Sequence, residues 1–185
     1  MTDLILVRHG ETNENSAGIL QGQTEGTLSE NGIKQNRLLA NRLKGLSFDV
    51  IFTSPLIRAV ETGKEILKFH NNIQLIEDVR LIERNMGILQ GRKIPESYDL
   101  NNEVEGMESL QSVFLRAQSF LEYALKYYNN RSVLIVSHGI TLIVITGIIK
   151  GIPTNEINNI KLLDNSTYAM YKITQNALNS FKNKK

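Results

Sequence analysis

Two histidines, each followed by a glycine, stand directly after short apolar runs, and they carry the most specific chemistry in the sequence. ILVRHGE places His9 after the run 4–7, and LIVSHGI places His138 after the run 133–136. Such runs predict strands that are covered on both faces. Ligands of an open α/β sheet bind outside the carboxyl ends of its strands, so two parallel neighbouring strands would bring both imidazoles to one crevice. The glycines would let the backbone approach a small ligand there.

One alternative use of the two histidines is metal ligation, but their surroundings favour an anion. Zinc sites take three or four ligands from His, Cys, Asp and Glu, often closely spaced. This chain has no cysteine and no HxH or HExxH pattern, whereas Arg8 precedes His9 and Arg58 stands in SPLIRAVET. A guanidinium repels a metal cation and pairs with two oxygens of a phosphate. We therefore predict a phosphate site that needs no metal and no cofactor.

The elements that must position these residues alternate along the chain. Short apolar runs separated by helical patterns predict a three-layer α/β/α sandwich around a mostly parallel sheet. Ser29 and Ser54 are the expected N-caps of the first two helices, with Pro55 in the first turn of the second. Leu38, Leu39 and Leu43 are expected on one face of the first. The expected strands cover 4–7, 50–52, 133–136 and 168–173, with a weak run at 75–76, and the expected helices cover 29–45, 54 onward, 108–128 and 140–149.

Length and composition describe an ordinary globular chain. Its 185 residues, 41% apolar and 22% charged, predict a single domain over 1–185 with a frayed tail at 175–185. A net charge of +2 is too small to indicate a protein that binds nucleic acid through its charge. The apolar stretch 133–149 is interrupted by polar residues and is shorter than the roughly 20 residues of a membrane span, so no membrane partner is expected.

The remaining features concern location and state. The first residues, MTDLILVRHGE, do not form the pattern of a signal peptide, and the absence of cysteine suits a reducing compartment, so we expect a cytoplasmic protein. We expect a monomer or a homodimer whose partner is a small-molecule phosphate ester. The third histidine, His70, follows a helix and is expected to be a surface or helix C-terminal residue.

Five segments resemble the histidine phosphatase superfamily, in its phosphoglycerate-mutase-like branch. They are VRHGETNEN, GILQGQTEGTLSENGIKQ, TSPLIRAVETGKEI, LIERNMGILQG and VSHG, in this order, and the resemblance runs over about residues 4–165. It implies a phosphoglycerate-mutase-like α/β fold and a cofactor-independent phosphatase of the acid phosphatase type.

The resemblance also implies roles for particular residues. It makes His9 the nucleophile that takes the phosphoryl group, and Glu83, in LIER, the proton donor to the leaving alcohol. A covalent step splits one difficult displacement into two, and the acid protonates an alkoxide that would otherwise leave poorly. The resemblance makes Arg8, Arg58 and His138 catalytic as well, as the cationic pocket that holds the phosphate oxygens. The residues implied to bind the phosphate are Arg8, Asn15, Gln21, Gly22, Arg58, His138 and Gly139.

Three departures from the mutase pattern favour hydrolysis of a small organic phosphate. Met86 stands where mutases have a tyrosine, Ile94 occupies a lysine position with Lys93 one place early, and the insertion that brings a pair of arginines is absent. An open site lets water take the phosphoryl group. Phosphoglycerate mutase is the alternative, because ERxxGxLQG is retained, and a catalytically silent phosphate-ester-binding protein is a third reading. The outer wall of the pocket is expected from 84–108, whose residues do not specify a leaving group.

Overall fold

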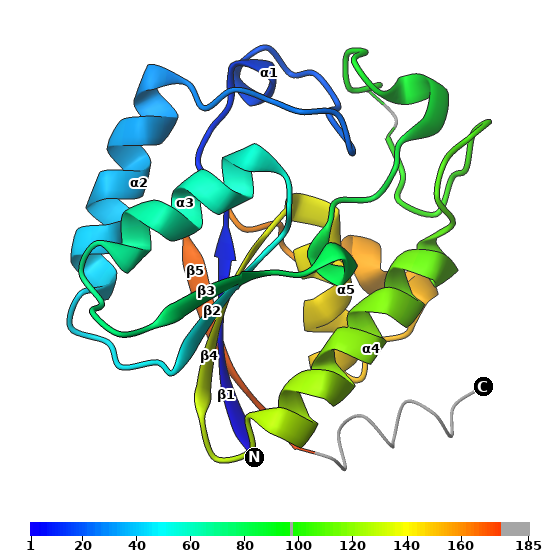
Figure 1. Cartoon of the computed structure of the whole chain (residues 1–185). Coiled ribbons are helices and arrows are strands. Elements are labelled where there is room, and N and C mark those ends of the chain that lie inside the picture. Colours follow the sequence, from blue (N-terminus) through cyan, green and yellow to red (C-terminus); the bar gives the residue numbers. More distant parts are fainter. Residues whose placement is uncertain (97, 175–185) are drawn as a thin grey trace.

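The computed structural model describes residues 1–96 and 98–174 (Figure 1). The tail expected at 175–185 lies outside the described residues. The strands are β1 (Thr2–Arg8), β2 (Val50–Thr53), β3 (Gln74–Glu77), β4 (Ser132–Ser137) and β5 (Tyr168–Ile173). The α-helices are α1 (Asn13–Ser16), α2 (Glu30–Leu43), α3 (Ile57–Leu67), α4 (Leu110–Tyr127) and α5 (Gly139–Lys150), and the 3₁₀ helices are η1 (Val79–Leu81), η2 (Gly87–Leu89) and η3 (Thr154–Asn159).

The described strands form one sheet in the order β3-β2-β4-β1-β5. β1, β2, β3 and β4 run parallel, and β5 is antiparallel to β1 at one edge. The register pairs Arg8 of β1 with Ser137 of β4, so these two strands end level with each other. The mostly parallel sheet predicted from the sequence is therefore confirmed.

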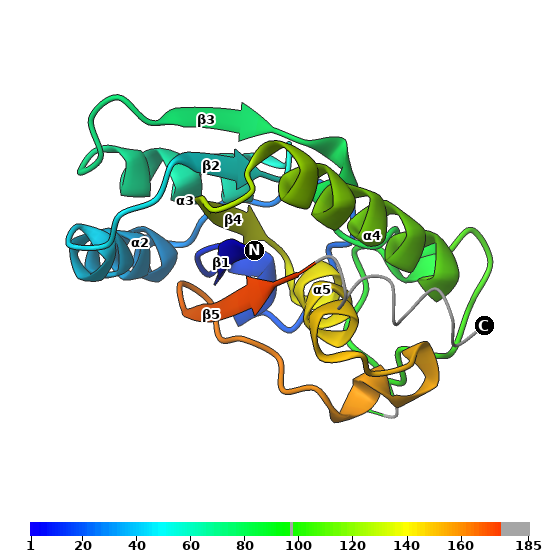
Figure 2. The same ribbon diagram turned by 90° about the horizontal axis from the view of Figure 1, so that it is seen from below.

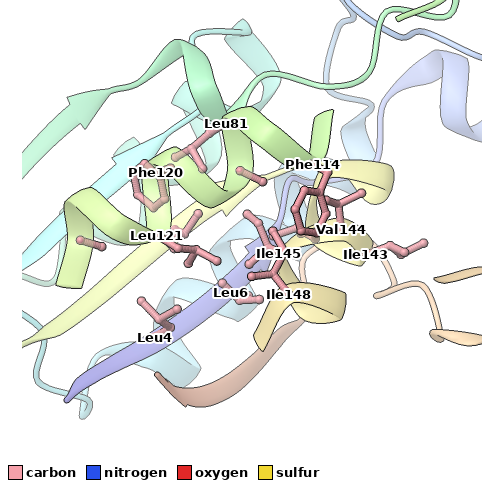
Figure 3. Close-up of a cluster of buried hydrophobic side chains, with 14 of the residues drawn as sticks. Leu4, Leu6, Leu81, Phe114, Phe120, Leu121, Ile143, Val144, Ile145 and Ile148 are labelled. Atoms are coloured by element: carbon pink, nitrogen blue, oxygen red, sulfur yellow. The ribbon is translucent and has the colours of Figure 1, made fainter. Parts of the chain in front are cut away.

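Alternate side chains of each strand enter two separate cores, as the period of two in a strand requires. Ile5 and Val7 of β1 pack with α2 and α3, whereas Leu4 and Leu6 pack with α4 and α5. Figures 1 and 2 show these helix pairs on opposite faces of the sheet, and Figure 3 shows Leu4 and Leu6 beside Phe120 and Leu121 of α4. The predicted three-layer sandwich is confirmed.

Two local predictions about the helices are wrong. Leu38 is 60% exposed, whereas Leu39 and Leu43, predicted on the same face, are buried in α2 together with Ala40. α3 begins at Ile57, and its N-cap residue is Leu56, whose side chain makes no capping hydrogen bond. Ser54 therefore does not cap this helix, and Pro55 lies before its first turn. The reason is that the hydroxyl of Ser54 has other partners, described below. Ser29 caps α2 as predicted, accepting from Gly32 N at 2.9 Å.

Two further expectations concern burial. His70 follows α3 as expected, but it is only 9% exposed because its ring packs against Phe48 with centroids 4.3 Å apart, so its prediction as a surface residue is wrong. The apolar stretch 133–149 divides into β4 and α5 as predicted. Among the described residues, no helix is long and apolar enough to cross a membrane.

Candidate active site

Three neighbouring parallel strands deliver the site residues to one edge of the sheet. His9 and His138 directly follow β1 and β4, and Ser54 directly follows β2. Backbone hydrogen bonds between the strand ends keep these residues level along the strand direction. His9 N donates to Ser137 O at 3.1 Å, and Ser54 N donates to Val136 O at 3.0 Å. In Figure 1 the loop around α1 and the green segment before α4 lie beyond this edge. The crevice predicted at the carboxyl ends of the strands is therefore present.

A cavity of about 490 Å³ lies at this edge. Its buried end is polar, and we call it the floor; it is formed by Arg8, His9, Asn15, Arg58 and Glu83. Its outer part is lined by Ile, Leu, Met and Tyr side chains of the segments 19–20, 86–100, 140–143 and 160–162, which we call the apolar wall. The size lies within the range of about 300–1,000 Å³ that is usual for small-molecule sites.

His9 is held as a neutral imidazole with a defined tautomer. Its Nδ1 lies 2.7 Å from Gly10 O, and because a carbonyl oxygen can only accept, Nδ1 carries the proton. Burial lowers the pKa of His9 well below its ordinary 6.5, and the positive charge of Arg58 lowers it further. The lone pair of Nε2 is therefore free at neutral pH. A neutral nitrogen of this kind is what nucleophilic attack on phosphorus requires.

His138 lies beside His9 but beneath the cavity. The two ring centroids are 5.0 Å apart, and the side chain of His138 is fully buried and does not line the cavity. Its Nε2 lies 2.6 Å from Ser54 Oγ, and the same oxygen accepts from Leu56 N. Burial, followed by the charge of Arg58, lowers the pKa of His138 well below 6.5. Burial therefore favours the neutral form of His138, and the contact with Ser54 Oγ orients its ring.

Two arginines supply the positive charge of the floor. Arg8 donates to Leu163 O at 2.7 Å, and Arg58 donates to Gly22 O and Thr24 O, both at 2.8 Å. Burial lowers the pKa of both guanidinium groups from their ordinary 12.5, while the charge of Glu83 raises it, and arginine remains charged in proteins. Arg8 Nε and Arg58 Nε are buried without a partner among the described residues. Buried charged donors of this kind favour an anionic ligand.

Glu83 is fixed at the N-terminus of α5. Its Oε2 accepts from Ile140 N at 3.2 Å, and its Oε1 accepts from Thr141 N at 3.1 Å and from its own neighbour Arg84 N at 2.9 Å. The carboxylate thereby takes up backbone N–H groups that the first turn of a helix leaves unpaired. This is why a residue from the segment after η1 lies at the cavity floor, beside the strand ends.

The four positions with weaker motif support lie around this floor, and all four line the cavity. Asn15 Oδ1 accepts from Thr12 N and Asn165 Nδ2, both at 3.3 Å, and Gln21 Nε2 donates to Thr12 Oγ1 at 2.7 Å. Gly22 has φ of +55°, and a Cβ on it would lie 2.4 Å from Gln90 Oε1, so only glycine fits where its carbonyl receives Arg58. A Cβ on Gly139 would lie 3.8 Å from Glu83 Oε2, and glycine leaves that space open.

The apolar wall is the part that sequence reasoning covered least. Met86, Ile94, Tyr98 and Leu100 come from the expected segment 84–108, but the other wall residues come from 19–20, 140–143 and 160–162. Ile140 and Ile143 lie two and five residues after His138 on the first two turns of α5, and that proximity was an available signal. The segments 19–20 and 160–162 are brought in by tertiary structure, and no local pattern marks them.

The buried histidines make stability depend on pH. Each stays neutral in the folded chain but takes up a proton near pH 6.5 when unfolded, so stability falls as pH decreases below 6.5. Each contributes up to about 1.4 kcal/mol per pH unit. His138→Gln should therefore reduce the slope of the unfolding free energy against pH, between pH 5 and 6.5, by about one proton. Urea titrations in phosphate-free buffer measure it, and an equal slope in both proteins would contradict a neutral His138.

The fold and site together define a class of protein. A neutral imidazole, two buried guanidinium groups and a carboxyl group meet at the carboxyl edge of an α/β sandwich. Among residues 1–96 and 98–174, no three His, Cys, Asp or Glu side chains are grouped to hold a metal ion. Two guanidinium groups can offset the charge of a phosphate, and the imidazole can take its phosphoryl group. These are the parts of a phosphoryl-transfer site.

Comparison with known proteins gives the family. The model of the histidine phosphatase superfamily (branch 1) matches residues 4–181, so the chain belongs to that superfamily. Phosphoserine phosphatase 1 of Hydrogenobacter thermophilus is 38% identical over 155 residues, covering 77% of this chain and 73% of the relative. A probable phosphoglycerate mutase GpmB of Erwinia tasmaniensis is 33% identical, covering 88% and 81%. The structure of Bacillus stearothermophilus YhfR has a TM-score of 0.85 at 24% identity, covering 95% of this chain and 93% of YhfR.

These findings confirm two predictions made from the sequence. The superfamily is the one that the five motifs resemble, and the fold is that of its members. The phosphatase class follows with the family, and phosphoglycerate mutase stands as the alternative. The roles of individual residues, the substrate and the oligomeric state remain predictions.

Proposed function

We propose that this protein hydrolyses a small phosphomonoester through a phosphohistidine formed on His9. One observation carries the proposal: a neutral, oriented imidazole shares a cavity floor with two charged guanidinium groups whose Nε–H donors lack partners among the described residues. A phosphomonoester carries about −1.5 to −2 charge at pH 7. The two positive charges suit that anion.

The first half of the reaction transfers the phosphoryl group to the enzyme. The lone pair of His9 Nε2 attacks phosphorus, the N–P bond forms and the bond from phosphorus to the ester oxygen breaks. Arg8 and Arg58 offset the charge on the transferring oxygens. Glu83, in its protonated form, gives a proton to the leaving oxygen, which departs as an alcohol.

The second half returns the enzyme to its starting state. Water attacks phosphorus, the N–P bond breaks and inorganic phosphate leaves, while the Glu83 carboxylate takes the proton of the water and is ready as an acid again. His138 remains neutral beneath His9, and we assign it the positioning of the nucleophile's ring rather than a proton transfer. The hydrogen bond between Ser54 Oγ and its Nε2 supports this assignment.

Mutase activity is the second candidate, supported by the GpmB relative and by the retained ERxxGxLQG motif. Two contacts disfavour it. Lys93 Nζ donates to Ala17 O outside the cavity, while Ile94 lines the cavity in its place. Arg84 is fully buried and donates to Leu100 O and Glu108 O, so it is not available to a carboxylate of the substrate. Conversion of 3- to 2-phosphoglycerate with a bisphosphate primer tests this candidate.

The proposed function is tested by release of inorganic phosphate. Para-nitrophenyl phosphate should be turned over, and a panel of phosphate esters should rank the natural leaving groups. Turnover also separates the enzyme from a silent phosphate-ester-binding protein, which would bind phosphate without releasing any from an ester. Conversion of phosphoglycerate without release of phosphate would replace the hydrolase with a mutase.

Metal independence is a specific prediction of the two-arginine floor. Because Arg8 and Arg58 hold the place of a cation, activity should be unchanged within about twofold after dialysis against EDTA. Vanadate should inhibit, since it resembles the transferring phosphoryl group. Kinetics with para-nitrophenyl phosphate before and after dialysis measure both effects. Loss of activity with EDTA and its recovery with zinc or magnesium would refute the argument.

A further inference from the structure

The charges of the cavity are all at one end. Among the described residues that line it, the charged side chains are Arg8, Arg58 and Glu83, and all three belong to the floor. The phosphate and the transferred proton occupy these three. The cavity of about 490 Å³ extends beyond them into the apolar wall. The leaving alcohol must therefore contact apolar side chains.

The segments that form the apolar wall are held in place by backbone hydrogen bonds and by a helix. The segments 18–20 and 91–94 pair as a short ladder, in which Leu20 N donates to Arg92 O, Gly91 N donates to Leu20 O and Ile94 N donates to Gly18 O, at 2.8 to 2.9 Å. Ile140 and Ile143 stand on the first turns of α5 and share its rigidity. A preformed apolar surface binds an apolar ligand without the cost of ordering it.

Two polar side chains of the wall region, Asn158 and Tyr98, already have partners, whereas Gln21 Oε1 has none among the described residues. Asn158 donates from Nδ2 to Asp99 Oδ1 at 2.7 Å and accepts from Leu100 N at 3.2 Å, so its amide holds the segment 98–100 in place. The hydroxyl of Tyr98 contacts Met86 Sδ at 3.8 Å. An ammonium or carboxylate on the leaving alcohol would meet these engaged groups and apolar carbon, and an unpaired charge in such a place is costly.

We propose that the substrate is a monophosphate ester of an alcohol with an apolar or aromatic body, and not phosphoserine or phosphoglycerate, whose alcohols are small and charged. The proposal rests on the proposed function for the hydrolysis itself. It differs from what the name of the Hydrogenobacter relative says of that protein. It assigns the apolar wall, rather than the floor, as the specificity-determining surface.

Calorimetry with alkylphosphonates tests the wall without any turnover. Ethyl-, butyl- and hexylphosphonate present the same anion with a growing chain, and each methylene that becomes buried is worth up to about fourfold in Kd. We expect hexylphosphonate to bind at least about tenfold more tightly than ethylphosphonate, with a more negative heat-capacity change. 2-Aminoethylphosphonate and 3-phosphonopropionate, of similar size but charged, should bind more weakly than propyl- and butylphosphonate.

A pair of double variants localises the effect. Ile94→Gln with Leu162→Gln makes the wall polar at two positions that are 50% and 41% exposed, so folding is spared. The matched control is Leu38→Gln with Leu115→Gln, which changes leucines that are 60% and 50% exposed on α2 and α4. The first variant should remove most of the gain from ethyl- to hexylphosphonate and leave ethylphosphonate unchanged, and the control should behave as the wild type.

The outcomes separate the two proposals. Equal affinity along the alkyl series, tighter binding of the charged analogues, or an equal loss in both double variants would overturn the substrate class. If the alkyl gradient appears and no phosphomonoester is hydrolysed, the wall binds as proposed and the proposed function is wrong. If hydrolysis occurs and kcat/KM is higher for phosphoserine than for hexyl phosphate, the hydrolase stands and the substrate class is wrong.

Discussion

His9→Ala is expected to lower kcat by roughly 10⁴-fold or more, the scale of losing a catalytic nucleophile. The reason is that the lone pair of His9 Nε2 forms the covalent bond to phosphorus, and the other floor side chains are guanidinium, amide and carboxyl groups that do not replace it. Quenched turnover of the wild type should show a phosphate label that is lost in acid and survives alkali, as a phosphoramidate does. The variant should show none.

Phosphate binding by the same variant is the control for folding. Arg8 and Arg58 are unchanged and the deletion removes one ring from the floor, so His9→Ala should still bind inorganic phosphate by calorimetry. Loss of phosphate binding together with activity would point to a collapsed site and would leave the nucleophile to be settled by mapping the label in the wild type. A label that mapped to Ser54 or Ser137 would refute the assignment of His9.

The floor could be predicted from the sequence because local rules determine most of it. His9, Arg8 and His138 each lie within one residue of a strand end, and parallel strands that end level with each other bring such residues together. Ser54 shows where this reasoning failed. Serine before proline is typical of a helix N-terminus, but here Ser54 bonds His138, 84 positions away, and the helix begins three residues later. Its Oγ also accepts locally from Leu56 N, but that bond does not cap a helix that begins at Ile57.

The apolar wall could not be predicted in the same way. Its segments are far apart in the chain and meet only because the 18–20 and 91–94 backbones pair and η3 holds the 98–100 segment through Asn158. Isoleucine and leucine in such segments have the same pattern as core residues, and the sequence does not distinguish them. The resemblance implies a cationic role for His138, whereas burial, which is a property of the folded chain, lowers its pKa.

Glu83→Gln is expected to reduce the phosphorylation rate from an alkyl phosphate by about a hundred- to ten-thousand-fold, the usual worth of a general acid. An alkoxide needs a proton in order to leave, whereas para-nitrophenolate hardly does. The same variant should therefore form the phosphoenzyme from para-nitrophenyl phosphate at nearly the wild-type rate. The aryl substrate is also the control for structure, since glutamine keeps one oxygen for the N–H groups of Ile140 and Thr141.

Single-turnover measurement is necessary for this test. The Glu83 carboxylate also takes a proton from water in the second half of the reaction, so a slow second step would mask a normal first step at steady state. An equal loss for both substrates in the phosphorylation step would show that Glu83 is not the acid. Neither Glu11 nor Glu103 lines the cavity: Glu11 accepts from Ser29 Oγ at 2.6 Å, and Glu103 is 52% exposed beside Arg84. Glu83 is thus the carboxyl group that the described cavity offers to a leaving oxygen, and the ratio of alkyl to aryl rates measures that proton directly.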